Sequence, residues 1–157
     1  NCDISSWDVS NVISTGFMFA RAISFNQNIS NWNVGNVECM SSMFQDAMSF
    51  NADISTWNVS NVEYMESMFE SATSFNADIS NWDVSNVGSM SSMFAQAINF
   101  NQDISSWNIT NVDEMSCMFD RARSFNQDIS KWNVSNTNTY AMFHGATVYT
   151  YKYPTSS

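Results

Sequence analysis

Apolar and polar residues follow one another along this chain in a pattern that returns every 25 residues. Six tryptophans mark the period, at Trp7, Trp32, Trp57, Trp82, Trp107 and Trp132. A unit of this length cannot bury its own apolar face, so successive units must stack and share a core. The pattern predicts a six-repeat solenoid over residues 1–147, with units that start near residues 1, 26, 51, 76, 101 and 126. Residues 148–157 would then form a capping strand or a linker.

Each unit changes its hydrophobic period half-way along. In the first half the spacing Ile-x-x-Trp-x-Val, as in Ile4, Trp7 and Val9, is typical of a short strand. In the second half apolar residues such as Met43 and Phe44 recur at steps of three and four, which is typical of one helix face. We therefore expect an α/β solenoid, with a parallel sheet on one side, short helices on the other and the Met-Phe pairs in its core.

The repeated motif also resembles a known family. Its first half resembles the leucine-rich-repeat pattern, with Ile-x-x-Trp-x-Val in place of Leu-x-x-Leu-x-Leu. The whole unit, D-I-S-x-W-N-V-S-N-V-x-x-M-x-x-M-F-x-x-A-x-x-F-N-Q, is similar to the BspA-like repeat of bacterial surface proteins and mycoplasma lipoproteins. The resemblance covers about residues 1–147 and implies a leucine-rich-repeat-like, right-handed coil. It also implies a secreted or surface-displayed protein suspected of adhesion, and it supplies no catalytic residues.

Charge and composition exclude several classes of function. The 15 acidic and 5 basic residues give a formal net charge of −10, which would repel nucleic acid and an anionic membrane surface. No apolar run approaches the ~18 residues of a membrane span. The single histidine, His144, has no cysteine or carboxylate motif beside it, and no phosphate loop or zinc spacing occurs. We therefore expect a non-enzymatic protein without a cofactor.

An acidic residue recurs near the start of most units. The row contains Asp3, Asp53, Asp78, Asp103 and Asp128, with Asn28 in the second unit. Each carboxylate can accept hydrogen bonds from its own turn, or adjacent carboxylates can share a calcium ion. Because Asn28 replaces a carboxylate without disturbing the repeat, local capping is the simpler interpretation, and a calcium ladder of Asp53, Asp78, Asp103 and Asp128 is the alternative.

The outward positions of the predicted strands form the candidate binding face. They are small and polar, and include Thr56, Asn58, Asn81, Asp83, Ser106 and Asn108. Tight protein-binding sites are usually rich in Trp, Tyr and Arg, so this face argues against a tight protein-binding concavity. Candidate N-glycosylation sequons begin at Asn28, Asn58, Asn108 and Asn133, although the repeat itself also generates the Asn-Val-Ser sequence.

The two ends of the repeat carry the candidate assembly residues. Cys39 and Cys117 would be separated by three stacked strands, roughly 14 Å, so we expect no disulfide between them and leave Cys2 free to pair outside the chain. The sixth unit is one residue short, and Tyr149, Tyr151 and Tyr153 then alternate as in a strand. A head-to-tail contact at such ends would build a filament.

These features favour a non-enzymatic protein of the extracellular space or cell surface. We expect it to act as a structural or adhesive scaffold that assembles end to end, with itself or other surface proteins and glycans as partners. The alternative is a ligand-binding module that recognises a glycan or a protein through its polar strand face. Neither interpretation involves nucleic acid or insertion into a membrane.

Overall fold

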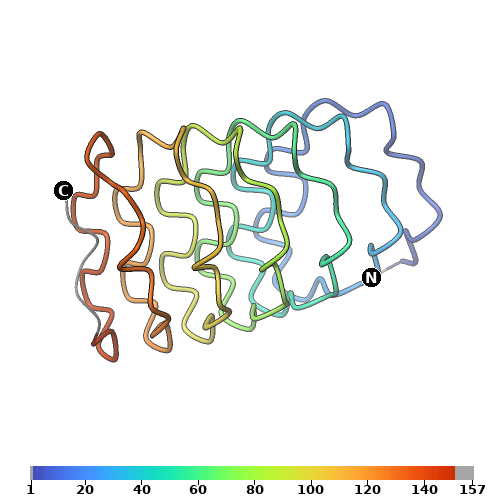
Figure 1. Ribbon diagram of the computed structural model, residues 1–157. Helices are drawn as coiled ribbons and strands as arrows, with labels where there is room; N and C mark the ends of the chain where they lie inside the picture. Colours follow the sequence, from blue (N-terminus) through green and yellow to red (C-terminus); the bar gives the residue numbers. More distant parts are fainter. Residues whose placement is uncertain (1, 151–157) are drawn as a thin grey trace.

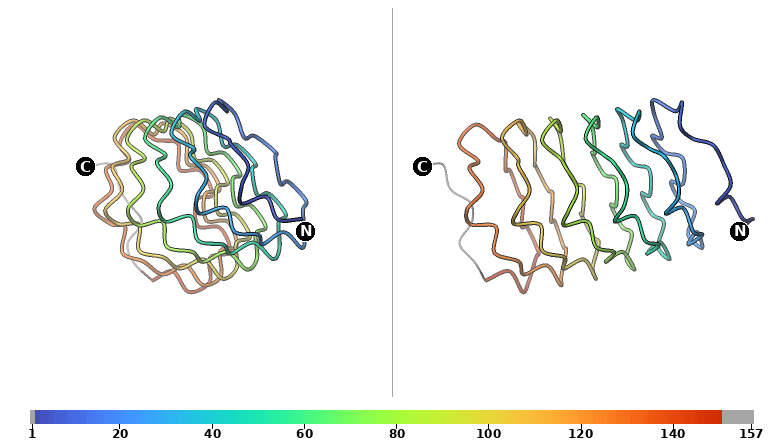
Figure 2. Two further views of the ribbon diagram at one scale, coloured as in Figure 1. Left: turned by 90° about the vertical axis from the view of Figure 1, so that its right-hand side faces the viewer. Right: turned by 45° about the vertical axis from the view of Figure 1, so that its right-hand side comes forward.

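The computed structural model describes residues 2–150. The chain winds through six similar coils that follow one another along one axis, so that the first coil lies at one end and the last at the other (Figure 1). We number them coil 1 (2–25), coil 2 (26–50), coil 3 (51–75), coil 4 (76–100), coil 5 (101–125) and coil 6 (126–150). Two further views show the coils as successive layers (Figure 2).

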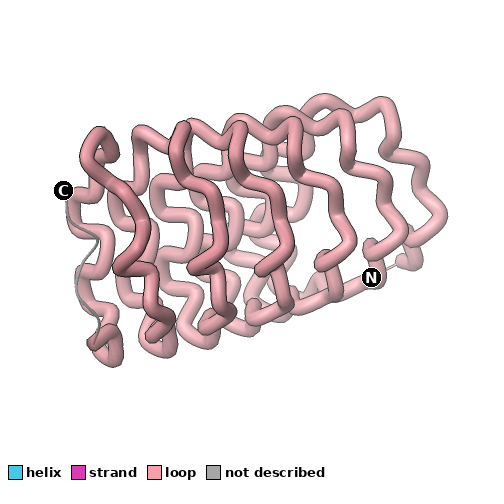
Figure 3. The backbone as a smooth tube through the Cα atoms, in the orientation of Figure 1, coloured by secondary structure: helices cyan, strands magenta, loops and turns pink. Residues whose placement is uncertain are grey.

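The predicted α/β architecture is wrong, because residues 2–150 contain neither a helix nor a strand. Turns and irregular backbone occupy the coils throughout (Figure 3). The parallel pairing is limited to one residue in each coil, and this column of isolated bridges runs through Ser14, Cys39, Tyr64, Ser89, Glu114 and Asn138. There is therefore no sheet on one side of these coils and no row of helices on the other.

Hydrogen bonds to the neighbouring coil replace those of the predicted helix. In coil 2 the N–H groups of Ser42, Phe44 and Asp46 donate to carbonyls of coil 3 at 2.8–2.9 Å. The N–H groups between them, on Met43 and Gln45, donate to carbonyls three residues earlier at 3.1–3.2 Å. An α-helix needs every N–H to bond four residues back, so this alternation forms a chain of turns instead.

Left-handed residues interrupt the same segment in every coil. Each coil has two residues of positive φ, four positions apart: Phe17 and Arg21, Ser42 and Asp46, Ser67 and Ser71, Ser92 and Gln96, Cys117 and Arg121, and Ala141 and Gly145. Helical residues have φ near about −63°. The three- and four-residue spacing therefore comes from consecutive turns that return side chains to the interior, and not from a helix face.

The first half of each coil also lacks its predicted strand. The backbone turns back on itself, as where the N–H of Trp32 donates to the carbonyl of Ile29 at 3.1 Å and that of Val37 to Val34 at 2.9 Å. Side chains connect the coils here instead of a backbone ladder. The amide of Asn61, for example, donates to the carbonyl of Gly35 in the preceding coil at 2.7 Å. Asn61 itself is exposed.

The Met-Phe pairs of coils 2 to 6 form the core, as predicted, but in coil 1 Met18 is 39% exposed and Phe19 is only partly buried. In coil 2 Met40, Met43 and Phe44 have no exposed surface, and the same holds for the aligned residues of coils 3, 4 and 5. The ring of Phe44 stacks on Phe50 of its own coil at 3.8 Å and on Phe69 of the next coil at 5.7 Å. The column of stacked rings runs through all six coils, from Phe19 in coil 1 to Tyr149 in coil 6. Burial of each such side chain contributes about 1.5–3 kcal/mol.

Candidate functional site

The acidic row caps its own turns. The carboxylate of Asp53 accepts hydrogen bonds from the backbone N–H of Ser55 at 2.9 Å and from its hydroxyl at 2.7 Å. Asn28 accepts the same two bonds from Ser30 at 3.0 and 2.8 Å, so a neutral amide forms an equivalent turn. No group of three His, Cys, Asp or Glu side chains within residues 2–150 is placed to hold a metal ion.

These hydrogen bonds also change the acidity of the row. The hydroxyl and the N–H of Ser55 both stabilise the charged carboxylate and so lower the pKa of Asp53, and Ser105 lowers the pKa of Asp103 in the same way. In Asp78 the backbone N–H of Ser80 is the larger cause of the lowered pKa. The neighbouring Asp53 raises it only slightly, so repulsion between adjacent rungs is weak.

The candidate binding face lies on the turns of coils 3 to 5. Asn81 and Asp83 are exposed there, together with Asn58. Two other members are bound to the neighbouring coil, because the hydroxyls of Thr56 and Ser106 donate to carbonyls 26 residues earlier at 3.2 and 3.3 Å. The four sequon asparagines, Asn28, Asn58, Asn108 and Asn133, are all exposed.

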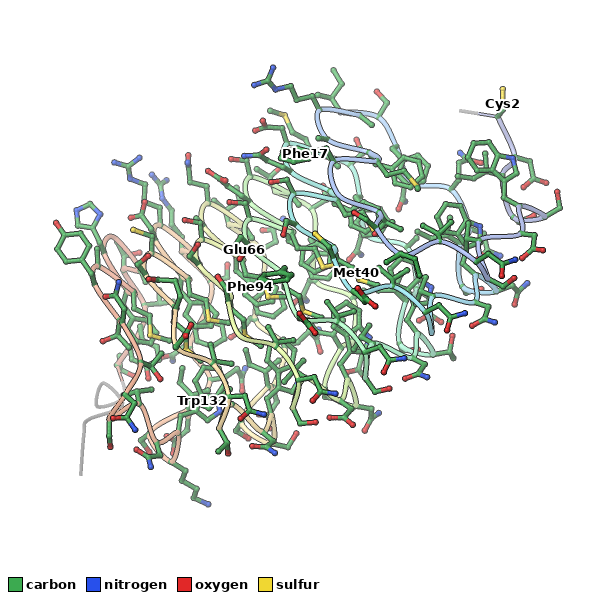
Figure 4. The ribbon with its side chains drawn as sticks, turned by 90° about the horizontal axis from the view of Figure 1, so that it is seen from above. Cys2, Phe17, Met40, Glu66, Phe94 and Trp132 are labelled. Atoms are coloured by element: carbon green, nitrogen blue, oxygen red, sulfur yellow. The ribbon has the colours of Figure 1, made fainter. Side chains whose placement is uncertain are left out.

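The end residues occupy different environments. Cys2 is exposed at the outer side of coil 1 (Figure 4), and Cys39 and Cys117 are partly buried free thiols. Tyr149 stacks on Phe143 at 4.0 Å and on Phe125 at 6.0 Å, so it continues the column of phenylalanines into coil 6. Tyr151 and Tyr153 lie outside the described residues.

Trp7 lies largely outside the core. It is 56% exposed, whereas the tryptophans of coils 2 to 6 are each 4% exposed. At the same end Phe17 and Met18 are 66% and 39% exposed, whereas the aligned Ser42 and Met43 of coil 2 are buried. The side of coil 1 that faces away from coil 2 is therefore apolar, because the positions that other coils bury against a preceding neighbour are open there.

Two side-chain hydrogen bonds close each of the first four junctions between coils. An indole N–H donates at 3.1 Å to the isoleucine carbonyl 28 residues earlier, in Trp32, Trp57, Trp82 and Trp107. An amide donates at 2.6–2.7 Å to the carbonyl 26 residues earlier, in Asn36, Asn61, Asn86 and Asn111. These bonds tie the polar turns of neighbouring coils together.

The junction between coils 5 and 6 lacks both of these bonds. Within the described residues the buried indole N–H of Trp132 has no acceptor, and only the Thr15 hydroxyl shares this condition. Asn136 donates to no carbonyl of coil 5 either. An unsatisfied buried donor costs about 1–3 kcal/mol. A cavity of about 400 Å³ opens at this junction, and Trp107 and Trp132 lie in its lining.

Three departures from the repeat lie at this junction. Ile109 occupies a position where the other units have valine, and Thr110 one where they have serine or glycine. Their additional methyl groups add volume between the coils on this side. Thr137 replaces a valine, and its hydroxyl donates to the carbonyl of Val112 at 2.8 Å. These substitutions are visible in the sequence, whereas the missing hydrogen bonds are visible only in the structure.

A protein-family model matches most of the chain. The sequence model of the family described as "Mycoplasma protein of unknown function, DUF285" matches residues 1–88 and again residues 52–155. Two overlapping matches are what a chain of near-identical units produces. No curated protein matches the chain. Within residues 2–150 there is also no helix of the length and hydropathy that crossing a membrane requires.

Proposed function

We propose a role for this chain from the premise that it belongs to the DUF285 family, a Mycoplasma family described as of unknown function. We propose that it is a non-enzymatic structural or adhesive scaffold, displayed at the cell surface or secreted, of the BspA-like type. The supporting observation is that contacts between neighbouring coils continue from coil 1 to coil 6. Each coil is therefore a template for the next, and a chain of this kind extends as a rod.

Hydrogen bonding between coils has a direction, which supports end-to-end assembly. In coils 2 to 6 alternate carbonyls accept N–H groups of the preceding coil, as the carbonyl of Ser41 accepts the N–H of Phe17 at 3.0 Å. In coil 1 the corresponding carbonyls, those of Gly16, Met18 and Ala20, accept no described N–H group. A coil of the same type would satisfy them, whether the same polypeptide or a second copy supplies it.

The other side of the stack presents the complementary groups. The N–H groups of Ala141 and Gly145 have no acceptor within the described residues, whereas the aligned N–H groups of Cys117 and Arg121 donate to coil 6 at 2.9 and 2.7 Å. The carbonyls of Gly16 and Ala20 and the N–H groups of Ala141 and Gly145 lie at positions that are bonded to each other in the junctions between described coils. We therefore propose that copies of the chain add to one another head to tail.

Electron microscopy and light scattering test this assembly. We expect rods whose length grows with protein concentration, and we expect Phe17→Asp to shorten them, because the charge is placed on the apolar outer side of coil 1 (Figure 4). Met48→Asp is the matched control, since Met48 is 47% exposed on the flank of the stack and its replacement should leave the rods unchanged. A monodisperse monomer at high concentration would count decisively against head-to-tail assembly.

A further inference from the structure

A groove of about 370 Å³ lies on one flank of coils 2 to 5. Each of these coils contributes one residue to each of two rows, two positions apart in the sequence. The rows are Asp46, Ser71, Gln96 and Arg121, and Met48, Thr73, Ile98 and Arg123. The residue between the two rows is a fully buried alanine in every one of these coils, so its side chain points inward and leaves the groove to the two rows. The volume lies within the range of binding pockets, about 300–1,000 Å³.

Positive charge gathers at one end of this groove. Arg121 and Arg123 are both exposed, and they are among only 5 basic residues in the chain. Within residues 2–150 neither guanidinium group forms an ion pair. Asp46 lines the other end of the groove, and Arg21 of coil 1 approaches its carboxylate at 3.9 Å. The coil 5 end therefore presents two positive charges with which no carboxylate of the described residues pairs.

Exposed apolar side chains lie in the same groove. Met48 and Ile98 are 47% and 39% exposed, in coils 2 and 4. The unbranched side chain of Met48 can adapt its shape to an apolar partner. Arginine and methionine are both enriched in protein interfaces, and arginine is frequent among the residues that dominate binding energy. The groove thus combines apolar surface with two free guanidinium groups.

We propose that this groove binds an extended segment of another protein, with an acidic side chain against Arg121 and Arg123 and apolar side chains against Ile98 and Met48. A guanidinium group can hold a carboxylate through two parallel N–H bonds. The inference goes beyond the scaffold role, because neither end of the stack lines the groove. The groove also shares no residue with the candidate binding face on the turns of coils 3 to 5.

The spacing of the coils sets the length of the segment. Met48 and Arg123 are three coils apart, and at about 4.8 Å for each coil this is roughly 14 Å. Extended backbone rises about 3.3 Å per residue and points alternate side chains to one side, so the first, third and fifth side chains of a pentapeptide span roughly 13 Å. A segment with apolar residues at its first and third positions and a carboxylate at its fifth therefore matches the groove.

Charge favours a peptide over a polyanion. The net charge of −10 repels a nucleic acid or a sulfated polysaccharide, whereas two guanidinium groups are enough for a single acidic side chain. A densely charged, hydrated chain would also lose water against Met48 and Ile98 without a compensating hydrogen bond. A peptide presents one carboxylate beside apolar side chains, which is the combination that the groove accommodates.

Titration with short peptides, followed in ¹H–¹⁵N spectra, tests the proposal. The probes are acetylated and amidated pentapeptides with leucine, valine or phenylalanine at the first and third positions, serine at the second and fourth, and glutamate at the fifth. We expect at least one of them to bind and to move the backbone N–H signals of Ile98 and Arg123, but not that of Ile23. Its counterpart ending in glutamine keeps the shape without the charge and should bind at least about tenfold more weakly.

Matched variants then locate the two halves of the contact. Arg121→Gln/Arg123→Gln should abolish the preference for glutamate over glutamine, whereas Arg21→Gln, at the aligned position of coil 1 and outside the groove, should keep it. Ile98→Asp should weaken binding of the glutamate peptide, whereas Ile23→Asp, also aligned and outside the groove, should not. The proposal would be overturned by absence of binding with every peptide, by equal binding of the glutamate and glutamine forms, by an unchanged preference in the double arginine variant, or by heparin binding more tightly than the peptides.

Discussion

Glycine at the left-handed positions should stabilise this fold, although it would destabilise a helix. In coil 4 Ser92 and Gln96 have φ values of 55° and 58°. Such a conformation costs an ordinary residue about 1–2 kcal/mol, whereas glycine adopts it freely. Coil 6 already has glycine at the position aligned with Gln96, where Gly145 has a φ of 70° and an added Cβ would lie 2.9 Å from Cγ of Arg121.

The expected magnitude follows from two opposing terms. Replacement by glycine removes the left-handed penalty, but it adds about 0.5–1 kcal/mol of backbone entropy to the cost of folding. Ser92→Gly and Gln96→Gly should therefore each change the free energy of unfolding by roughly 0 to +1.5 kcal/mol. Their N–H groups donate to the next coil at 2.9 and 2.7 Å, and glycine keeps both bonds. In a helix each change would instead cost up to about 1 kcal/mol.

Urea unfolding of the double variant, compared with Ser91→Gly, measures this difference. Ser91 precedes the first left-handed residue and has a negative φ, so its replacement should destabilise the chain by about 0.5–1 kcal/mol. The midpoints are comparable where the slope with urea is unchanged. If the double variant lost at least as much stability as Ser91→Gly, the proposed role of the left-handed residues would be refuted.

Three further predictions concern the turns, the junctions and the core. Because hydrogen bonds lower the pKa of Asp53 in the folded state, its stabilising effect is present above the unfolded pKa and is lost as the pH falls through the folded value, below about pH 4. Asp53→Asn should therefore reduce the loss of thermal stability in acid, and an unchanged pH profile would contradict this assignment. Trp82→Phe should cost about 1 kcal/mol more in urea unfolding than Trp132→Phe, because only the first removes a formed N–H bond; equal losses would argue against an open junction. Phe75→Ala should cost about 3–5 kcal/mol in the same assay, whereas Ile98→Ala, at a 39% exposed position, should cost well under 1.5 kcal/mol; similar losses would show that the phenylalanine column is not the core.

The spacing of apolar residues predicted which residues are buried far better than it predicted the secondary structure. Met43 and Phe44 were placed in the core by a pattern of three- and four-residue steps, and both are fully buried. The same steps fit a helix and a succession of turns equally, because both return a side chain to one face after three or four residues. Burial depends on that return, so the pattern predicts it in either case.

For the candidate sites, too, the sequence predicted some features and missed others. Capping of Asp53 by its own turn was predictable, because the serine two residues later is part of the same repeated motif. The gap beside Trp132 was not, since it consists of hydrogen bonds that fail to form between residues 26 and 28 positions apart. Ile109 and Thr137 were visible as departures from the repeat, but their effect depends on what the next coil places opposite them.

The sequence by itself therefore determined the 25-residue period, most of the buried residues and the polar turns, because each depends on local pattern and on identity between units. Trp7 and Met18, in coil 1, are the exceptions among the buried positions. The tertiary structure alone decided the backbone conformation and the open junction. In the second half of each coil, alternate N–H groups donate to the carbonyls of a neighbouring coil and so are not available for helical bonds. Whether a backbone N–H bonds to a carbonyl of its own coil or of the next coil depends on where the next coil lies. That position is defined only once the coils have stacked.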